Sequence, residues 1–191
     1  IPDFQSGSMK ATHRSPSPGT AMKFAERFFS TATNACVNLN RRGVLLTRHA
    51  EQIPASLPAS VRHVSYAPFG ALLPRVGALV HHGGIGTTAQ ALRAACPQLV
   101  TPLSHDQFDN GYRCKRLGVA DVVDQSHFKE PRVTQALRRL IDDETIKRKC
   151  DEIARRFAGE TPLDLACAMI ESVAPTTGGT PVPPEKNSLR Q

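Results

Sequence analysis

The feature that most constrains the fold of this chain is an alternation of short apolar runs with longer amphipathic segments. The apolar runs have the length of buried strands, and each is bounded by Gly, Pro or polar residues. Such an alternation is typical of a parallel sheet with helices on both faces, because parallel strands need a crossover connection. We therefore expect an α/β fold. The predicted strands are 43–47, 61–65, 78–81, 98–101 and 120–123, with a further one near Phe4, and the predicted helices are 21–36, 87–95, 106–117, 132–141, 143–157 and 162–173.

The length of 191 residues suits one domain with a hydrophobic core rather than two small ones. We assign residues 1–174 to this domain. Residues 175–191 are rich in Pro, Gly and polar side chains and cannot bury enough apolar surface to fold. We expect them to form a disordered tail.

Composition excludes several classes of protein. The formal net charge is +7, but the 24 Lys and Arg residues are dispersed, with few aromatic side chains among them. We therefore expect a solvated basic face and no nucleic-acid partner, while a peripheral contact with an acidic membrane stays open. The five cysteines lack CxxC spacing, which argues against a disulfide framework and a zinc site. Because no apolar run of about eighteen residues is present, we expect a soluble, cytoplasmic protein with reduced thiols.

A glycine-rich turn at 82–88 follows the apolar segment 78–81 and leads into a predicted helix. Glycine lets the backbone approach a ligand closely, and the first amides of a helix lack intrahelical partners and attract an anion. His82, Thr87 and Thr88 add further hydrogen-bond donors. The pattern favours a phosphate site, although on its own a plain tight turn capped by threonine fits it equally well.

The segment 84–89 also satisfies the GxGxxG/A fingerprint of dinucleotide-binding domains, with Asp106 twenty residues beyond Gly86. That fingerprint usually follows the first strand and its acidic residue ends the second, whereas this turn follows several strands. The NAD(P)-binding domain of an oxidoreductase is therefore the alternative interpretation.

Four motifs extend the pattern beyond the turn, at 66–75, 78–87, 96–102 and 106–110. In this order and spacing they resemble the donor-binding half of the glycosyltransferases that use UDP- or TDP-activated sugars. They are most similar to bacterial rhamnosyl- and sterol-type members. The resemblance implies a Rossmann-like domain that forms one half of the two-domain GT-B architecture. It also implies that the N-terminal domain, which binds the acceptor, is absent from this chain.

The resemblance implies a role for each part of the glycine turn. The residues expected to bind the donor diphosphate are His82, Gly84, Gly86, Thr87, Thr88 and, from a Gly-Ser turn near the N-terminus, Ser8. Helix amides and hydroxyl groups would together form this cradle.

The other motifs would bind the remaining parts of the donor. By resemblance, Tyr66 stacks on the nucleobase, the backbone of Ala67 binds the base edge, and Gln90 accepts from the ribose. Asp106 and Gln107 would bind hydroxyls of the transferred sugar. From the residues alone, Tyr66 also fits a half-buried core aromatic and Asp106 a helix N-cap.

Other polar residues show no ligand pattern. We expect structural or exposed positions for His49, His63, His81, His105 and His127, and we do not count Asn110 among the site residues. No metal site is predicted.

The resemblance implies an inverting transfer of a sugar from a UDP- or TDP-sugar to a hydroxyl of a lipid or small molecule. The turn would stabilise the charge that develops on the leaving diphosphate, with no cofactor besides the nucleotide-sugar substrate. The catalytic base is expected on the absent domain, so we assign no catalytic residue to this chain and expect it to bind donor without transferring sugar. A non-catalytic module that binds nucleotide sugars is the third interpretation.

Overall fold

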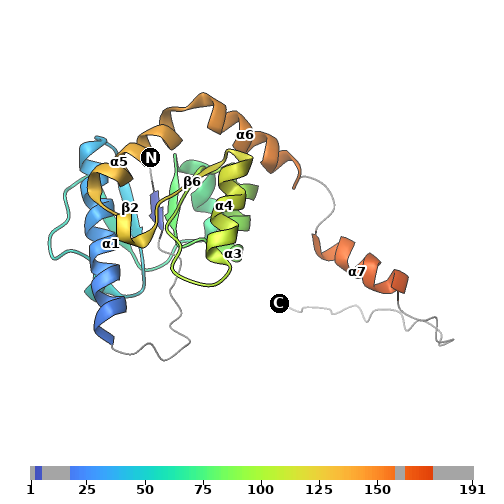
Figure 1. Ribbon diagram of the computed structural model, residues 1–191, viewed down its shortest axis with the longest axis horizontal. Coiled ribbons are helices and arrows are strands. Elements are labelled where there is room, and N and C mark those ends of the chain that lie inside the picture. The colour runs from blue at the N-terminus through green and yellow to red at the C-terminus, as the bar shows by residue number, and fades with distance from the viewer. Residues whose placement is uncertain (1–2, 6–17, 158–161, 174–191) are drawn as a thin grey trace, which may run out of the picture. The chain divides into compact units, whose positions relative to one another are not determined.

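The computed structural model describes residues 3–5, 18–157 and 162–173, with side chains over 25–157 and 164–173 (Figure 1). The chain divides into two compact units, Ile1–Ala158 and Gly159–Gln191. The first unit contains the sheet, and the second contains helix α7 (Pro162–Val173).

The strands of the first unit form one parallel sheet. They are β1 (Asp3–Gln5), β2 (Gly43–Leu46), β3 (Val61–Val64), β4 (Leu79–His81), β5 (Gln98–Val100) and β6 (Ala120–Val122). Their order is β3-β2-β1-β4-β5-β6. The order reverses between β1 and β4, where Phe4 lies beside Val80. In open α/β sheets a ligand binds at such a switch point, at the carboxyl ends of the strands.

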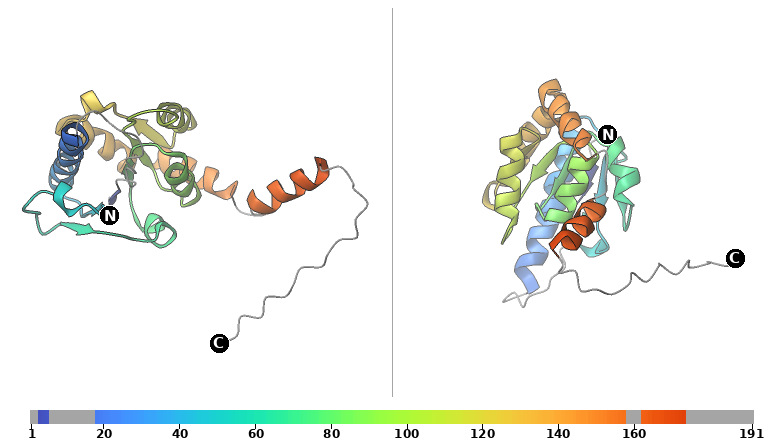
Figure 2. Two further views of the ribbon diagram at one scale, coloured as in Figure 1. Left: turned by 90° about the horizontal axis from the view of Figure 1, so that it is seen from below. Right: turned by 90° about the vertical axis from the view of Figure 1, so that its right-hand side faces the viewer.

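Helices cover both faces of the sheet, as the views in Figures 1 and 2 show. They are α1 (Pro18–Asn38), α2 (Phe69–Leu72), α3 (Ile85–Arg93), α4 (Gln107–Leu117), α5 (Glu130–Asp142) and α6 (Glu144–Arg155). Helix α1 packs on α5, whereas α3 and α4 lie together on the other face, and α6 contacts both α3 and α5. Short 3-10 turns occur at η1 (Ala50–Gln52), η2 (Leu73–Arg75) and η3 (Gln125–His127).

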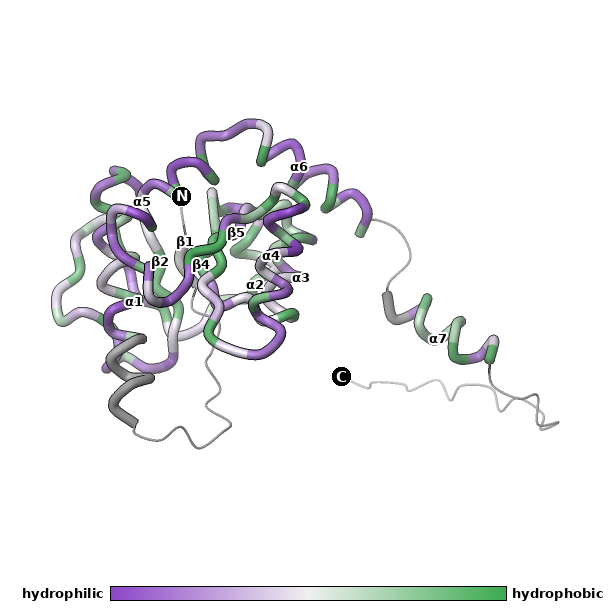
Figure 3. The backbone as a smooth tube through the Cα atoms, viewed as in Figure 1, coloured by the Kyte–Doolittle hydropathy of each residue, from purple (hydrophilic) through white to green (hydrophobic). Residues whose placement is uncertain are grey.

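The main hydrophobic core lies between the sheet and the pair α1 and α5. Phe28 stacks on Phe128 with ring centroids 5.0 Å apart, and both side chains are buried together with Val80 and Leu99 of the central strands. A smaller cluster forms around Leu79 and Ala91, where α3 meets the sheet. Figure 3 shows the resulting pattern, with hydrophobic segments on the central strands and hydrophilic ones on the outer helices.

The observed architecture confirms the predicted α/β fold with a Rossmann-like parallel sheet. Each predicted strand is present within one residue of its expected ends, and the strand near Phe4 is β1. The predicted helices are present too, with α1 extending to 18–38 and α3 beginning two residues earlier than expected. Helix α2 and the 3-10 turns were not predicted. The tail at 175–191 lies outside the described residues.

Helix α7 carries exposed apolar side chains at Leu165, Met169, Ile170 and Val173. In the described part of the chain, no helix is long and apolar enough to span a membrane. All five cysteines are free thiols, and only Cys167 on α7 is exposed.

Candidate functional site

The turn after β4 has a backbone that only glycine fits. Gly83 has a φ of +92°, and a Cβ there would lie 2.7 Å from Val100 Cγ1 and 2.9 Å from the carbonyl oxygen of Gln107. An L side chain is strained at positive φ, and these neighbours leave no space for one. The turn is therefore packed directly against β5 and the first residue of α4.

Helix α3 begins at this turn with its first amides unpaired within the helix. Gly84 is the N-cap residue, and the first helical bond runs from the amide of Thr88 to the Gly84 carbonyl at 3.0 Å. The amides of Ile85, Gly86 and Thr87 precede that bond, so they have no partner within the helix. A Cβ built at Gly86 would meet none of the described residues within 4 Å. The helix N-terminus thus offers amide donors and a partial positive charge to an anion.

His82 lies against the start of α3. Its Nε2 would be 2.6 Å from a Cβ at Gly84, and the buried Nδ1 has no hydrogen-bond partner among the described residues. Burial lowers the pKa of His82, and the Asp106 carboxylate opposes this shift. The ring is therefore neutral near pH 7, and an anion bound at the helix would favour its protonated form.

His81 is a structural residue, in agreement with the prediction. It is fully buried, its Nδ1 accepts from the Gly83 amide at 3.2 Å, and its Nε2 donates to Gln98 Oε1 at 2.9 Å. Burial, assisted by the neighbouring His82, lowers the pKa of His81 to about 3. A neutral imidazole at this position can accept and donate at the same time.

The two threonines at the start of α3 differ in their exposure to solvent. Thr87 is half-buried, whereas Thr88 is buried. The Thr88 hydroxyl has no access to solvent, and the Thr88 amide donates to the Gly84 carbonyl. The predicted contact of Thr88 with a phosphate therefore has no solvent-accessible donor in this conformation, although the buried hydroxyl has no hydrogen-bond partner among the described residues. Gln90 is exposed one turn further on, with Nε2 3.4 Å from the Gly86 carbonyl.

The loop after β5 brings a second group of polar residues to the turn. Asp106 is exposed and is the N-cap residue of α4, as the N-cap interpretation expects, but its side chain makes no hydrogen bond to the helix amides. Instead, Asp106 Oδ2 accepts from Asn110 Nδ2 at 2.8 Å. The same Nδ2 donates to the Gly83 carbonyl at 3.0 Å.

Gln107 supports the loop that precedes α4. Its Oε1 accepts from the amides of Leu103, at 2.8 Å, and Ser104, at 3.2 Å. Since this carbonyl is engaged, the Gln107 side chain can serve a ligand mainly as a donor through Nε2.

Sequence reasoning missed the contacts of Asn110. Asp106 and Asn110 are four residues apart, a spacing that places two side chains on the same face of a helix. That spacing could have predicted their hydrogen bond, whereas the contact with Gly83 depends on tertiary packing.

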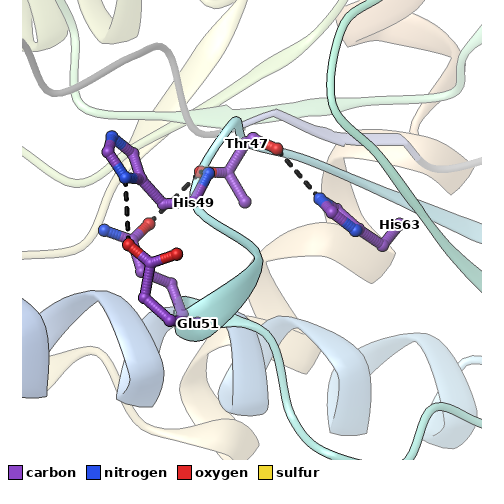
Figure 4. A network of polar contacts seen from close by, with 5 residues as sticks. Thr47, His49, Glu51 and His63 are labelled. Atoms are coloured by element: carbon purple, nitrogen blue, oxygen red, sulfur yellow. Dashed lines mark hydrogen bonds and ion pairs between the residues drawn. The ribbon is translucent and has the colours of Figure 1, made fainter.

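A polar network connects the ends of β2 and β3 (Figure 4). His63 Nε2 donates to the Thr47 carbonyl at 2.9 Å, and the Thr47 hydroxyl accepts from the His49 amide at 3.1 Å and donates to Gln52 at 3.2 Å. The exposed His49 and Glu51 side chains pair at 3.0 Å. The pKa of Glu51 is lowered, first by a hydrogen bond from its own backbone and then by His49. The network fixes the strand end from which the 66–68 segment leaves the sheet.

Tyr66 follows β3 with 66% of its surface exposed, so the alternative of a half-buried core aromatic is wrong. Ala67 beside it is half-buried. The ends of β3 and β4 are three strand spacings apart in the sheet, about 14 Å. A ligand of the size of a nucleoside diphosphate can bridge that distance.

The structure thus brings His82, Gly84, Gly86 and Asp106 together around one turn and leaves Tyr66 further along the same edge of the sheet. Ser8 lies outside the described residues, although β1, which precedes it, is paired with β4.

The topology disfavours the dinucleotide alternative. The strand order is that of dinucleotide-binding domains, but the glycine segment 84–89 follows β4 rather than β1, and Asp106 follows β5 rather than β2. In those domains the fingerprint turn follows the first strand.

Comparison with known proteins identifies the family of this chain. The model of the family described as erythromycin biosynthesis protein CIII-like, C-terminal domain, matches residues 35–171. The O-mycaminosyltylonolide 6-deoxyallosyltransferase of Streptomyces fradiae is 33% identical over 144 residues, which cover 74% of this chain and 33% of that protein. A sterol 3-beta-glucosyltransferase of Vanderwaltozyma polyspora is 32% identical over 105 residues, which cover 55% of this chain and 8% of that protein.

Solved structures show the same fold. The kitacinnamycin glycotransferase superposes with a TM-score of 0.73 and 23% identity, covering 89% of this chain and 42% of that one. The glycosyltransferase VinC, solved in complex with DTDP, gives a TM-score of 0.70 and 25% identity, with coverage of 90% and 41%. The chain therefore spans a third or less of the two curated relatives and about two fifths of these solved chains.

Proposed function

Because this chain belongs to the erythromycin biosynthesis protein CIII-like C-terminal domain family, whose relatives are GT-B glycosyltransferases, we propose that it binds the nucleotide-sugar donor of such an enzyme. The donor would be a UDP- or TDP-activated sugar. VinC was solved with DTDP, which supports a pyrimidine nucleoside diphosphate as the class of ligand.

One observation carries the proposal: the unpaired amides at the start of α3 lie beside His82 at the switch point of the sheet. A diphosphate has the negative charge that this helix end attracts, and it has acceptors for each amide. We assign the diphosphate to His82, Gly84, Gly86 and Thr87, and also to Ser8, which follows β1 in the sequence.

The two ends of the donor would extend from this point. Toward β3, the exposed Tyr66 ring offers a stacking face for the base, Ala67 its backbone, and Gln90 a ribose contact. Toward α4, Asp106 keeps Oδ1 for a sugar hydroxyl, and Gln107 keeps its amide donors.

In the proposed inverting transfer, this domain stabilises the leaving group. Negative charge grows on the diphosphate as its bond to the anomeric carbon breaks, and the α3 amides are held in advance at the site of that charge. The base that deprotonates the acceptor hydroxyl, and the acceptor site itself, would belong to an N-terminal domain. The 191 residues alone should therefore bind donor without turnover.

We further propose a cytoplasmic location, where nucleotide sugars are available. The five free thiols are consistent with a reducing compartment. A peripheral contact with an acidic membrane is a second proposal for the net charge of +7.

Calorimetric titration with UDP, TDP and NAD tests the proposal. We expect UDP and TDP to bind with micromolar or weaker Kd, because part of the site is contributed by residues beyond this domain. His82→Ala should weaken both about tenfold, since it removes a charge-assisted contact. The exposed His127→Ala variant is the matched control. Tighter binding of NAD than of either nucleotide would favour the oxidoreductase interpretation.

The sugar end has its own test. Asp106→Ala should leave the affinity for UDP and TDP within about twofold but weaken UDP-glucose and TDP-glucose about tenfold. Asp109→Ala, which removes the same charge from the exposed face of α4, should change neither. If transfer fails even when the full-length protein is assayed, the domain is a non-catalytic binding module.

A further inference from the structure

We infer that Asn110 and His81 are positioning residues that hold Gly83 from opposite sides, and that Asn110 couples the diphosphate turn to the sugar-binding carboxylate of Asp106. The inference rests on the proposed function and specifies how the two parts of that site are kept in register.

Both polar groups of Gly83 are held by side chains. Its amide donates to His81 Nδ1 at 3.2 Å, and its carbonyl accepts from Asn110 Nδ2 at 3.0 Å. The neighbouring atoms of Val100 and Gln107 leave no space around its Cα. The φ of +92° is thus maintained by two hydrogen bonds and by packing.

The bond from Asn110 also fixes an amide of the anion site. A peptide is planar, and no described peptide is cis, so the Gly83 carbonyl and the Gly84 N–H point in opposite directions. Asn110 therefore determines where the Gly84 N–H points. Gly84 is the N-cap of α3, so this amide leads directly into the three unpaired ones.

The second N–H of Asn110 donates to Asp106 Oδ2. The side-chain amide of Asn110 thus joins the Gly83 carbonyl, in the glycine turn, to Asp106 Oδ2, in the carboxylate proposed to bind the sugar. The other carboxylate oxygen, Oδ1, stays available for a sugar hydroxyl. Only an amide of this length makes both contacts, because aspartate cannot donate and serine has a single proton to share.

His81 completes the arrangement from inside the sheet. Its Nε2 donates to Gln98 Oε1 on β5, and this bond leaves Nδ1 as the acceptor that the Gly83 amide needs. The His81 carbonyl also accepts from the Thr101 amide at 2.8 Å, which ties the end of β4 to the loop before α4.

The test measures Kd for UDP, TDP, UDP-glucose and TDP-glucose with Asn110→Ala and Asn110→Asp. Asn110→Ala should weaken UDP and TDP about fivefold, through the turn, and the two sugar nucleotides about twentyfold, through the turn and Asp106. Asn110→Asp keeps the shape without the donors and adds repulsion with Asp106, so it should be at least as poor. Arg113→Ala, which breaks an ion pair with Asp109 on the same helix, should leave every Kd unchanged.

A double variant isolates the coupling. When Asp106→Ala is already present, adding Asn110→Ala should weaken the sugar nucleotides only about fivefold, the same factor as for UDP and TDP. An unchanged set of Kd values in Asn110→Ala, with only a lower thermal midpoint, would overturn the inference. So would equal factors for nucleotides and sugar nucleotides in the single variant.

Nuclear magnetic resonance separates this inference from the proposed function. If the wild-type chain binds no nucleoside diphosphate, the proposed function has failed. In the unliganded protein, the amide resonances of Gly83 and Gly84 should still shift in Asn110→Ala and His81→Leu but not in Arg113→Ala. Unshifted resonances would show that neither side chain positions the turn.

Discussion

The turn after β4 and the segment after β3 lie at the same edge of the sheet but are built differently. In the turn, Gly83 is fixed by two side-chain hydrogen bonds and by close packing. After β3, the network around Thr47 fixes only the end of the strand, and Tyr66 beyond it is largely exposed.

This contrast predicts where the affinity for the proposed donor would arise. Groups held in place before binding lose little entropy when the ligand arrives, whereas an exposed ring must be ordered. The phosphate end should therefore supply most of the binding energy. The base end should add less, and it should discriminate weakly between uracil and thymine.

Substitution of Gly83, at the rigid end, should have the strongest effect. Gly83→Ala places a methyl group 2.7 Å from Val100 Cγ1 in a backbone with positive φ. Strain and overpacking together should lower the free energy of unfolding by about 2–5 kcal/mol and abolish binding of UDP and TDP. Chemical denaturation and calorimetry measure the two losses.

Gly86 is the matched control for that substitution, because a Cβ there meets no atom within 4 Å in the part of the chain that the structure describes. Gly86→Ala should leave the free energy of unfolding unchanged or raise it by up to about 1 kcal/mol, since alanine favours a helix. If Gly83→Ala were as stable as Gly86→Ala, the turn would be adaptable rather than rigid.

The next largest effect is a loss of folding stability as pH falls, caused by His81. The folded-state pKa of His81 is lowered to about 3, so between that value and about 6.5 the unfolded chain binds a proton that the folded chain does not. His81 thus contributes stability above pH 6.5 that is lost as pH falls, at about 1.4 kcal/mol per unit. Denaturation between pH 7 and 5 should show this slope, and His81→Asn, which keeps an acceptor for Gly83 but cannot titrate, should reduce it. An unchanged slope in that variant would mean that other groups carry the acid sensitivity.

The fold was predictable because local patterns determine it. The short segments 78–81 and 98–101 each have an apolar pair bounded by Gly, Pro or polar residues, which predicts a buried strand, and each is followed by an amphipathic segment that becomes a helix. Helix α2 was missed because four residues are too few for a periodic pattern. The strand order could not be predicted in the same way, since strand pairing depends on contacts between segments that are distant in the chain.

The site was predictable in part for the same reason. The glycine turn and the helix start are local features, and the structure contains both. The burial of Thr88 and the contact from Asn110 to Gly83 were not predictable, because 27 residues separate Asn110 from Gly83 in the chain and only packing joins them. His81 was recognised as structural, but its hydrogen bond to the turn requires the neighbouring strand that carries Gln98.

Substitution of Tyr66, at the exposed end, should have the weakest effect. Because the Tyr66 side chain is 66% exposed, Tyr66→Ala should change the free energy of unfolding by less than about 0.5 kcal/mol. It should weaken the binding of UDP and TDP about threefold to tenfold, through lost stacking, and leave the weaker binding of pyrophosphate, which has no base, unchanged.

Tyr66→Trp offers a larger stacking face and should strengthen the binding of both nucleotides. Tyr112→Ala on α4, where the ring is 49% exposed, controls for loss of a surface aromatic. Equal losses for pyrophosphate and the nucleotides in Tyr66→Ala would assign the ring to the phosphate end and remove the distinction between the two regions.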